Sequence, residues 1–256
     1  GLHWRLYNWV VKVYAERLVR GVVSGRILTN SSWTAAQIYK IHRVIADVVY
    51  PPVDVEYFSR ASRDDKREKI IVTISRFTVE KRLDRIVDVA ARLRDYIFVL
   101  IGSTHEYSYK VLNEIERKIK EHHLDNVIVE TSLPRTKVLE YLETARFYLH
   151  PETAEHFGIA VVEAMAAGLV PLVYRDGGAW HDIVSKVWDT LGYGSIEEVP
   201  EIIRRIDSDN SLYEKLRRRS TEISKIFSYE NFKKNLLEKI EYVLKVKRIA
   251  SSHRGS

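Results

Sequence analysis

The sequence predicts an α/β fold in which helices cover both faces of a parallel sheet. From residue 69 onward, short apolar runs rich in β-branched and aromatic residues alternate with longer runs that carry no helix breaker. Strands that are joined through helices pair in parallel, and both faces of such a sheet are covered. With 256 residues, 45% of them hydrophobic, the chain can bury a sizeable core. Ligands of such folds bind beyond the carboxyl ends of the strands.

The first 58 residues precede this regular pattern. An apolar stripe predicts an amphipathic helix over residues 2–19, followed by a strand over 26–30. Ser31 or Ser32 could cap a helix over 34–46. Two adjacent prolines, Pro51 and Pro52, end regular structure, and the charged residues 60–69 predict a solvated connector.

The regular part contains five strands and four intervening helices, and three more helices follow it. We expect strands over residues 69–75, 96–102, 126–130, 145–150 and 171–174, with helices over 80–94, 107–122, 135–144 and 158–167. The later helices cover residues 200–206, 212–226 and 229–246. The last has an apolar stripe, which predicts that it packs on the first segment.

Composition and charge narrow the class of protein. The chain has no cysteine, which excludes disulfides and thiolate metal sites, and its many Lys, Glu and Ile residues resemble proteins of hot environments. A net charge of +6 favours anionic partners, whether nucleotide phosphates, lipid head groups or nucleic acid. No nucleic-acid motif is present, so nucleic acid is not expected. No run reaches about 18 apolar residues and no signal peptide is visible, so we expect a cytoplasmic protein.

The most informative stretch is residues 151–178, PETAEHFGIAVVEAMAAGLVPLVYRDGG. It places Glu155 and Glu163 around a turn that enters a helix, directly after a buried strand. Free amides and the positive dipole end favour an anion at such a turn. Both glutamates could instead be ordinary solvated residues, because glutamates eight residues apart also occur in the charged helices of this chain. The apolar, small-residue context of this pair favours a site.

The other strand ends carry weaker candidates. Arg76 and Lys81 follow the first strand and could reach one diphosphate, or could simply be exposed cations. Gly102 allows close approach by a ligand or makes a plain turn, and residues 131–134 could hold a planar base. There is no dinucleotide fingerprint, no P-loop and no metal-binding histidine set.

Several of these motifs, in this order, resemble glycosyltransferase family 4, the retaining enzymes with the GT-B fold. The resemblance covers residues 69–184 through SRFTVEK, FVLIG, EHFGIAVVE, AMAAGLVPLV and GG followed by DIV. Within the family, TNSSWTAAQI, VVYPPVD and GGAWHDIV are similar to the eukaryotic α-1,2-mannosyltransferases that use GDP-mannose on a dolichol-linked oligosaccharide.

The resemblance implies a division of the chain and a role for each site residue. Residues 1–58 would be the end of an acceptor domain, 59–228 a complete Rossmann-like donor domain, and 229–256 a helix packing back on the first part, with a tail. Glu155, Arg76 and Lys81 would serve catalysis, and the last two would also bind the diphosphate. Glu163 would bind the ribose, and Glu155 the sugar. The remaining donor contacts would come from Gly102, Leu133, His156, Phe157, Gly158 and Ile159.

The implied activity is transfer from a nucleotide sugar, with GDP-mannose favoured, to a lipid-linked or glycan acceptor at the cytoplasmic membrane face. Peripheral membrane association and independence of metals and other cofactors are implied as well. Two alternatives are a nucleotide-sugar 2-epimerase of the same fold and a non-catalytic donor-binding subunit of a split enzyme. The sequence departs from the family at Ser75, Arg82 and Ser103, where glycines or other residues are usual, which affects the phosphate and base contacts. Residues 1–58 are shorter than an acceptor domain, so we expect a fragment.

Overall fold

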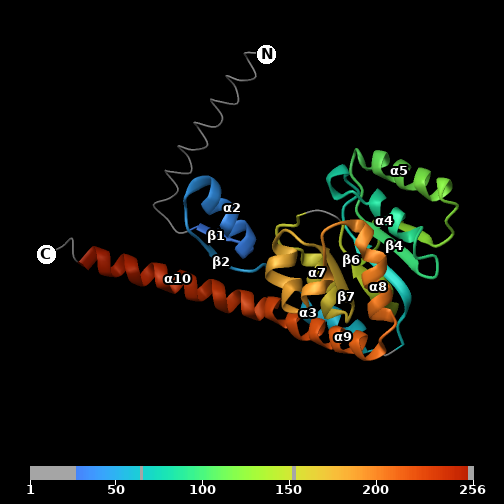
Figure 1. Cartoon of the computed structure of the whole chain (residues 1–256). Coiled ribbons are helices and arrows are strands. Elements are labelled where there is room, and N and C mark those ends of the chain that lie inside the picture. The colour runs from blue at the N-terminus through green and yellow to red at the C-terminus, as the bar shows by residue number, and fades with distance from the viewer. Residues whose placement is uncertain (1–26, 64–65, 152–153, 253–256) are drawn as a thin grey trace, which may run out of the picture.

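The computed structural model describes residues 27–63, 66–151 and 154–252 (Figure 1). The helix expected over residues 2–19 lies outside this part of the chain. The described residues form a small N-terminal segment, a large α/β body and a long C-terminal helix.

The body contains a six-stranded sheet in the order β5-β4-β3-β6-β7-β8, with every neighbouring pair parallel. This confirms the predicted α/β class. The chain adds strands outward from β3 to β5, then crosses β3 and continues outward from β6 to β8. The strand order therefore reverses between β3 and β6. The strands are β3 (Glu68–Ile74), β4 (Ile97–Gly102), β5 (Val127–Thr131), β6 (Ala145–Leu149), β7 (Val170–Tyr174) and β8 (Gly192–Tyr193).

Helices surround the sheet and bury its apolar strands, whose central side chains, Val72 and Phe147 among them, are inaccessible to solvent. They are α3 (Val55–Phe58), α4 (Asp84–Ala90), α5 (Ser108–Glu121), α6 (Arg135–Thr144), α7 (Ile159–Ala166), α8 (Val199–Asp207) and α9 (Asn210–Ser224).

In the body, some predicted elements differ from the structure. The helix expected over residues 80–94 is a 3₁₀ turn, Val79–Lys81, followed by the shorter α4. Arg82 separates them because its φ of 49° lies in the left-handed region, which a continuing helix cannot accept. The sequence also missed β8, whose two residues are too few to show a strand period.

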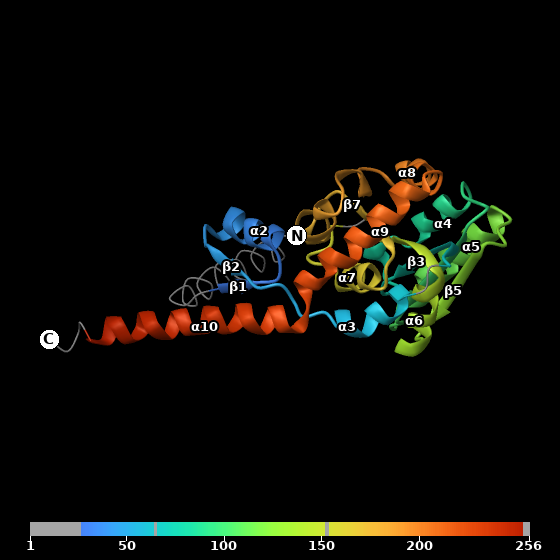
Figure 2. The same ribbon diagram turned by 90° about the horizontal axis from the view of Figure 1, so that it is seen from below.

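The N-terminal segment is a small parallel unit: β1 (Ile27–Thr29) pairs with β2 (Ala46–Val48), and α2 (Ser32–His42) joins them. Ser31 caps α2 as predicted, since its hydroxyl accepts a hydrogen bond from the Thr34 amide at 3.0 Å. The helix ends earlier than residue 46 because Arg43 adopts a φ of 57°. The long helix α10 (Tyr229–Ser252) runs beside this unit, and Lys239 Nζ lies 2.8 Å from Asp47 (Figure 2).

A buried carboxylate fastens the N-terminal segment to the body. Asp182 accepts hydrogen bonds from the Ser32 amide at 2.9 Å and from the Tyr50 hydroxyl at 3.0 Å. The first of these satisfies an amide at the N-terminus of α2, where a negative charge is also favoured by the helix dipole. Burial of the phenol, and then the charge and hydrogen bond of Asp182, raise the pKa of Tyr50 to about 12.

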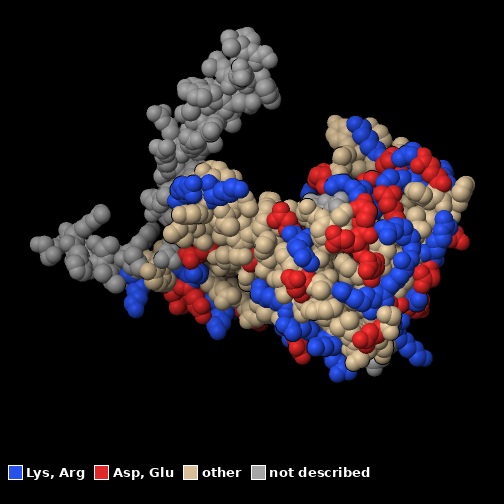
Figure 3. All heavy atoms as spheres, viewed as in Figure 1, with Lys and Arg blue, Asp and Glu red and all other residues tan. Residues whose placement is uncertain are grey.

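The surface of the body carries side chains of both charges. Lys and Arg alternate with Asp and Glu over the face of the body seen in Figure 3. Among the described residues, no helix is long and apolar enough to cross a membrane.

The connector before β3 is not fully solvated as the sequence suggested. Arg67 is only 9% exposed, and its guanidinium donates to the carbonyls of four residues. These residues are Ala61, Leu142, Ala145 and Ala167. A charged side chain therefore ties the connector to the ends of α6 and α7.

We expect Arg67→Met to lower the free energy of unfolding by about 3 kcal/mol or more, because several buried carbonyls lose a charged donor at once. Chemical denaturation of the purified chain measures this. Arg94→Met is a matched control, since Arg94 also donates to two carbonyls but at the surface. Its cost should stay below about 1 kcal/mol. Equal losses for the two variants would contradict the role assigned to Arg67.

Candidate functional site

A cleft of about 560 Å³ lies where the carboxyl ends of β3, β4 and β6 meet. This is the place where the strand order reverses, and loops on the two sides of such a reversal diverge and leave a crevice. Of the residues predicted to bind a ligand, those that line the cleft are Arg76, Lys81, Gly102, Glu155, His156, Phe157, Gly158 and Ile159. Leu133 and Glu163 are not among the lining residues.

The N-terminus of α7 forms one wall of the cleft. Gly158 caps this helix with a φ of +100°, and a Cβ there would lie 3.0 Å from Val161 and 3.1 Å from Ala179. The carbonyl of Gly158 accepts from the amide of Val161 at 3.1 Å, while the preceding helix amides, of Ile159 and Ala160, have no partner within the helix. Both residues line the cleft, so their amides can bind an anion there.

An ion pair spans the cleft between the loops that follow β3 and β6. Lys81 Nζ lies 2.5 Å from Glu155 Oε2, and both side chains are mostly shielded from solvent. His150 Nε2 lies 3.6 Å from the same oxygen. The neighbouring imidazole and then the Lys81 ammonium lower the pKa of Glu155 to about 2, against the opposing effect of burial. Glu155 is therefore a carboxylate at neutral pH.

Two glycines behind Glu155 hold its loop in place. The Gly178 amide donates to the Glu155 carbonyl at 2.7 Å, and Gly177 has a φ of +88°. A Cβ on Gly177 would lie 2.4 Å from the Glu155 carbonyl oxygen, and one on Gly178 would lie 2.1 Å from that of His156. The GG pair is thus required by backbone packing against the site loop.

Gly102 also serves backbone packing, because a Cβ there would lie 1.9 Å from the Ser75 carbonyl oxygen. The sequence left open whether this glycine allows approach by a ligand or by the chain. The structure shows approach by the chain, at the floor of the cleft.

Glu163 lies on the second turn of α7, where it is partly buried and does not line the cleft. Its carboxyl makes no hydrogen bond or ion pair with another residue of the described part of the chain. Burial raises its pKa to about 7, opposed by the charge of Arg135. Ionising a carboxyl in such a place costs free energy, and carboxyls with strongly shifted pKa values cluster at functional sites. Leu133 packs against the core on the loop between β5 and α6.

Sequence reasoning missed several residues of the cleft. His150, which was not among the predicted site residues, is 3% exposed and lines the cleft. Asn30 and Pro51 come from the N-terminal segment, so the cleft is shared between the segment and the body. Their contribution depends on packing between distant parts of the chain, although the position of His150 at the end of a predicted strand was a usable signal.

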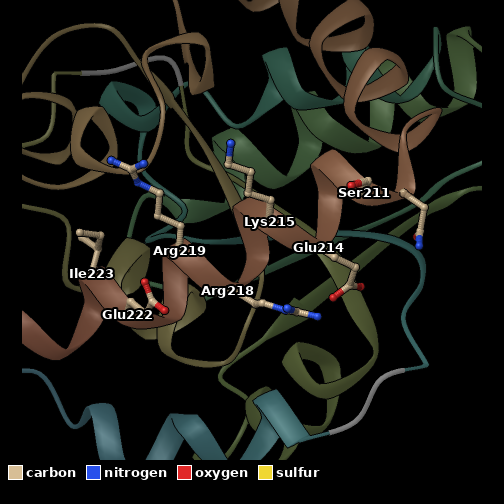
Figure 4. A pocket seen from close by; sticks show the side chains of 8 residues that line it. Ser211, Glu214, Lys215, Arg218, Arg219, Glu222 and Ile223 are labelled. Atoms are coloured by element: carbon tan, nitrogen blue, oxygen red, sulfur yellow. The ribbon is translucent and has the colours of Figure 1, made fainter.

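A second concavity, of about 690 Å³, lies along α9 (Figure 4). Its lining comes from one helix and mixes three cations, Lys215, Arg218 and Arg219, with the carboxylates of Glu214 and Glu222. It lacks the converging loops and the helix N-terminus of the first cleft, which we take as the site. Within the described residues, no group of three or more potential ligands could hold a metal ion.

Comparison with known proteins identifies relatives along most of the chain. The family model for glycosyl transferases group 1 matches residues 54–223. The chain is 28% identical to the GDP-Man:Man(3)GlcNAc(2)-PP-Dol alpha-1,2-mannosyltransferase of Neurospora crassa, over 97% of this chain and 50% of that protein. It is 29% identical to the human protein of the same name, over 88% of this chain and 50% of the relative. The chain thus spans about half the length of these curated relatives.

Solved structures show the same fold. A glycosyltransferase from Rickettsia africae matches with a TM-score of 0.73 and 15% identity, covering 86% of this chain and 64% of that one. Sucrose-phosphate synthase from Thermosynechococcus elongatus matches with a TM-score of 0.75 and 16% identity, covering 90% and 62%. These likenesses confirm the predicted GT-B type fold.

The raised pKa of Glu163 predicts a pH-dependent effect on stability. Between pH 4.5 and about 7 the folded chain retains a proton that the unfolded chain has lost, so stability falls as the pH rises through this window. Glu163→Gln removes that cost. At pH 8 the variant should be more stable than the parent by up to about 3 kcal/mol, with little difference at pH 4.

Urea denaturation of both proteins at several pH values measures this difference. Glu222→Gln, on the exposed face of α9, controls for the substitution itself. A difference between parent and Glu163→Gln that does not change with pH would show that the carboxyl is not held in a costly environment.

Proposed function

Because the chain belongs to the glycosyl transferases group 1 family, we propose that its cleft binds a nucleotide sugar and that the whole protein transfers the sugar to an acceptor. The observation that carries this proposal is the convergence of two cations, a carboxylate and a helix N-terminus at one reversal of strand order. The cations and helix amides can bind a negatively charged diphosphate, and the carboxylate can accept hydrogen bonds from sugar hydroxyls.

The cleft supports a role for each residue in this reaction. Arg76 and Lys81 both line the cleft, and Arg76 is exposed. Both cations can therefore approach a diphosphate that lies near the amides at the N-terminus of α7. As the bond to the sugar breaks, negative charge builds on the leaving diphosphate, and fixed donors stabilise that charge in the transition state. Glu155 is ionised and can accept hydrogen bonds from two neighbouring sugar hydroxyls. Glu163 is proposed to bind the ribose.

GDP-mannose is the donor that we propose, and a lipid-linked glycan is the acceptor. Both are supported by the names of the relatives, which specify GDP-Man and a dolichol-linked substrate. Those names do not favour the epimerase alternative. A lipid-linked acceptor would bring the protein to the cytoplasmic face of a membrane as a peripheral protein.

We further propose that transfer retains the configuration of the sugar. The acceptor would attack from the face that the diphosphate leaves, and the departing phosphate would help to remove the proton of the acceptor hydroxyl. No protein nucleophile is required on this route. Arg76, Lys81 and the helix amides supply the positive charge, so the proposal needs no metal ion.

Removing either cation should weaken diphosphate binding more than nucleoside binding. We expect Arg76→Met and Lys81→Met each to weaken GDP by about 1.5–3 kcal/mol, the worth of a charge-assisted contact, while guanosine changes little. Calorimetric titration with EDTA present measures both ligands. Lys120→Met is the control, since Lys120 pairs with Glu116 on α5, away from the cleft. Equal losses for GDP and guanosine would overturn these two assignments.

The two glutamates should respond differently to substitution. Glu163→Ala should weaken both GDP and GDP-mannose, by about 1.5–3 kcal/mol if a hydrogen-bonding carboxyl is lost. Glu155→Gln should weaken GDP-mannose alone, because its contacts reach only the sugar. It should leave GDP unchanged or bound more tightly, since Lys81 is then released from its ion pair.

Calorimetric titration of the two variants with both ligands tests the division. If Glu155→Gln weakens GDP as much as Glu163→Ala does, the carboxylates do not have separate ligands. Binding of neither ligand by the parent chain would refute the proposed function itself.

A further inference from the structure

His150 is a buried imidazole at the carboxyl end of β6 that the proposed reaction does not use. It is 3% exposed and lines the cleft, yet its Nε2 has no hydrogen-bond partner among the described residues. A buried polar atom without a partner costs free energy, so its presence in a ligand cleft calls for an explanation.

The surroundings fix the imidazole and aim Nε2 at Glu155. The His150 amide donates to the Leu172 carbonyl at 2.8 Å, and its carbonyl accepts from the Tyr193 hydroxyl at 2.6 Å. On the ring, Nδ1 lies 3.3 Å from the Tyr148 hydroxyl, which itself lies 3.1 Å from the Ile74 carbonyl. Nε2 then lies 3.6 Å from Glu155 Oε2, slightly too far for a hydrogen bond.

Lys81 occupies the position that the imidazole would otherwise take. Its ammonium is 2.5 Å from the same oxygen, Glu155 Oε2. Burial lowers the pKa of His150, the charge of Lys81 lowers it further, and Glu155 opposes both. Among the described residues, the titratable groups that act on the ring are Glu155, Lys81 and the Tyr148 phenol. While Lys81 stays on Glu155, burial and the Lys81 charge favour the neutral imidazole.

A bound diphosphate changes this balance, because Lys81 cannot give its full charge to Glu155 and to the diphosphate at once. Without Lys81, Glu155 would be a shielded carboxylate whose nearest cation had left. His150 is then the described group best placed to replace it.

We propose that His150 is a positioning residue that exchanges with Lys81: when a nucleotide sugar draws Lys81 to its diphosphate, the imidazole takes a proton from solvent and donates Nε2–H to Glu155. This inference rests on the proposed function. The exchange keeps Glu155 ionised and oriented toward the sugar while Lys81 neutralises the leaving group. One proton from solvent is taken up with the ligand and forms the Nε2–H bond, and no bond between heavy atoms forms or breaks.

Calorimetry can count that proton. GDP-mannose is the suitable probe because its diphosphate is esterified at both ends and has no group that titrates near neutral pH. Titrations near pH 7 in two buffers of different ionisation enthalpy should show uptake of a substantial fraction of a proton per ligand in the parent chain. His150→Gln retains a hydrogen-bond donor but cannot take a proton, so it should still bind GDP-mannose while the uptake disappears.

A second measurement needs no ligand and does not alter His150. Lys81→Met removes the ammonium that pairs with Glu155, so His150 can take its place without a ligand. The pKa of the His150 imidazole should then be higher than in the parent chain, and NMR titration measures it. The His150→Gln spectrum identifies the resonance. Adding Glu155→Gln to Lys81→Met should abolish the rise.

The outcomes separate the two proposals. Failure of GDP-mannose to bind the parent chain refutes the proposed function. Binding without proton uptake, or an imidazole pKa that Lys81→Met leaves unchanged, refutes the exchange while the donor site stands.

Discussion

The adjacency of β3 and β6 is the constraint on which the site depends. A parallel sheet that grows first to one side and then to the other leaves one pair of neighbouring strands whose following loops leave in different directions. Arg76 and Lys81 follow β3, while His150 and Glu155 follow β6, so residues about 75 positions apart in sequence face one another. The GG pair after β7 then holds the second loop by backbone contact. The arrangement therefore follows from the strand order of the sheet.

The two glutamates of one motif occupy opposite electrostatic environments. Eight residues of separation place Glu155 before α7, beside Lys81 and His150. Glu163 lies on the second turn of the helix, where it is partly buried and has no hydrogen bond or ion pair with another described residue. The pKa of the first is lowered to about 2, and that of the second is raised to about 7. Folding alone does not require the second carboxyl, which a glutamine could replace at lower cost. Its retention is consistent with a ligand that supplies the missing hydrogen-bond donors.

The sequence predicted the fold well because its apolar runs are separated by turns and helices of ordinary length. Residues 135–144 were predicted as a helix with the same bounds that α6 has in the structure. It predicted cleft residues on the loops after β3 and β6, such as Arg76 and Glu155, but also Leu133 after β5, which does not line the cleft. It could not predict the Lys81–Glu155 pair, the burial of Arg67 or the place of Asn30, because each depends on packing between distant segments. The backbone roles of Gly102 and Gly177 likewise depend on contacts that local pattern does not encode.

The Lys81–Glu155 pair constrains how the cleft can bind an anion. Part of the attraction between the ammonium and a diphosphate must offset the loss of the existing pair, which is shielded from solvent and therefore strong. A cleft with an unopposed lysine would bind phosphate compounds more tightly but less selectively. Under the proposed function, a diphosphate attached to a hydroxylated sugar would offer one group to Lys81 and another to Glu155. On that proposal, the ion pair would favour an intact nucleotide sugar over free phosphate, because the sugar hydroxyls would give Glu155 new partners when Lys81 turns to the diphosphate.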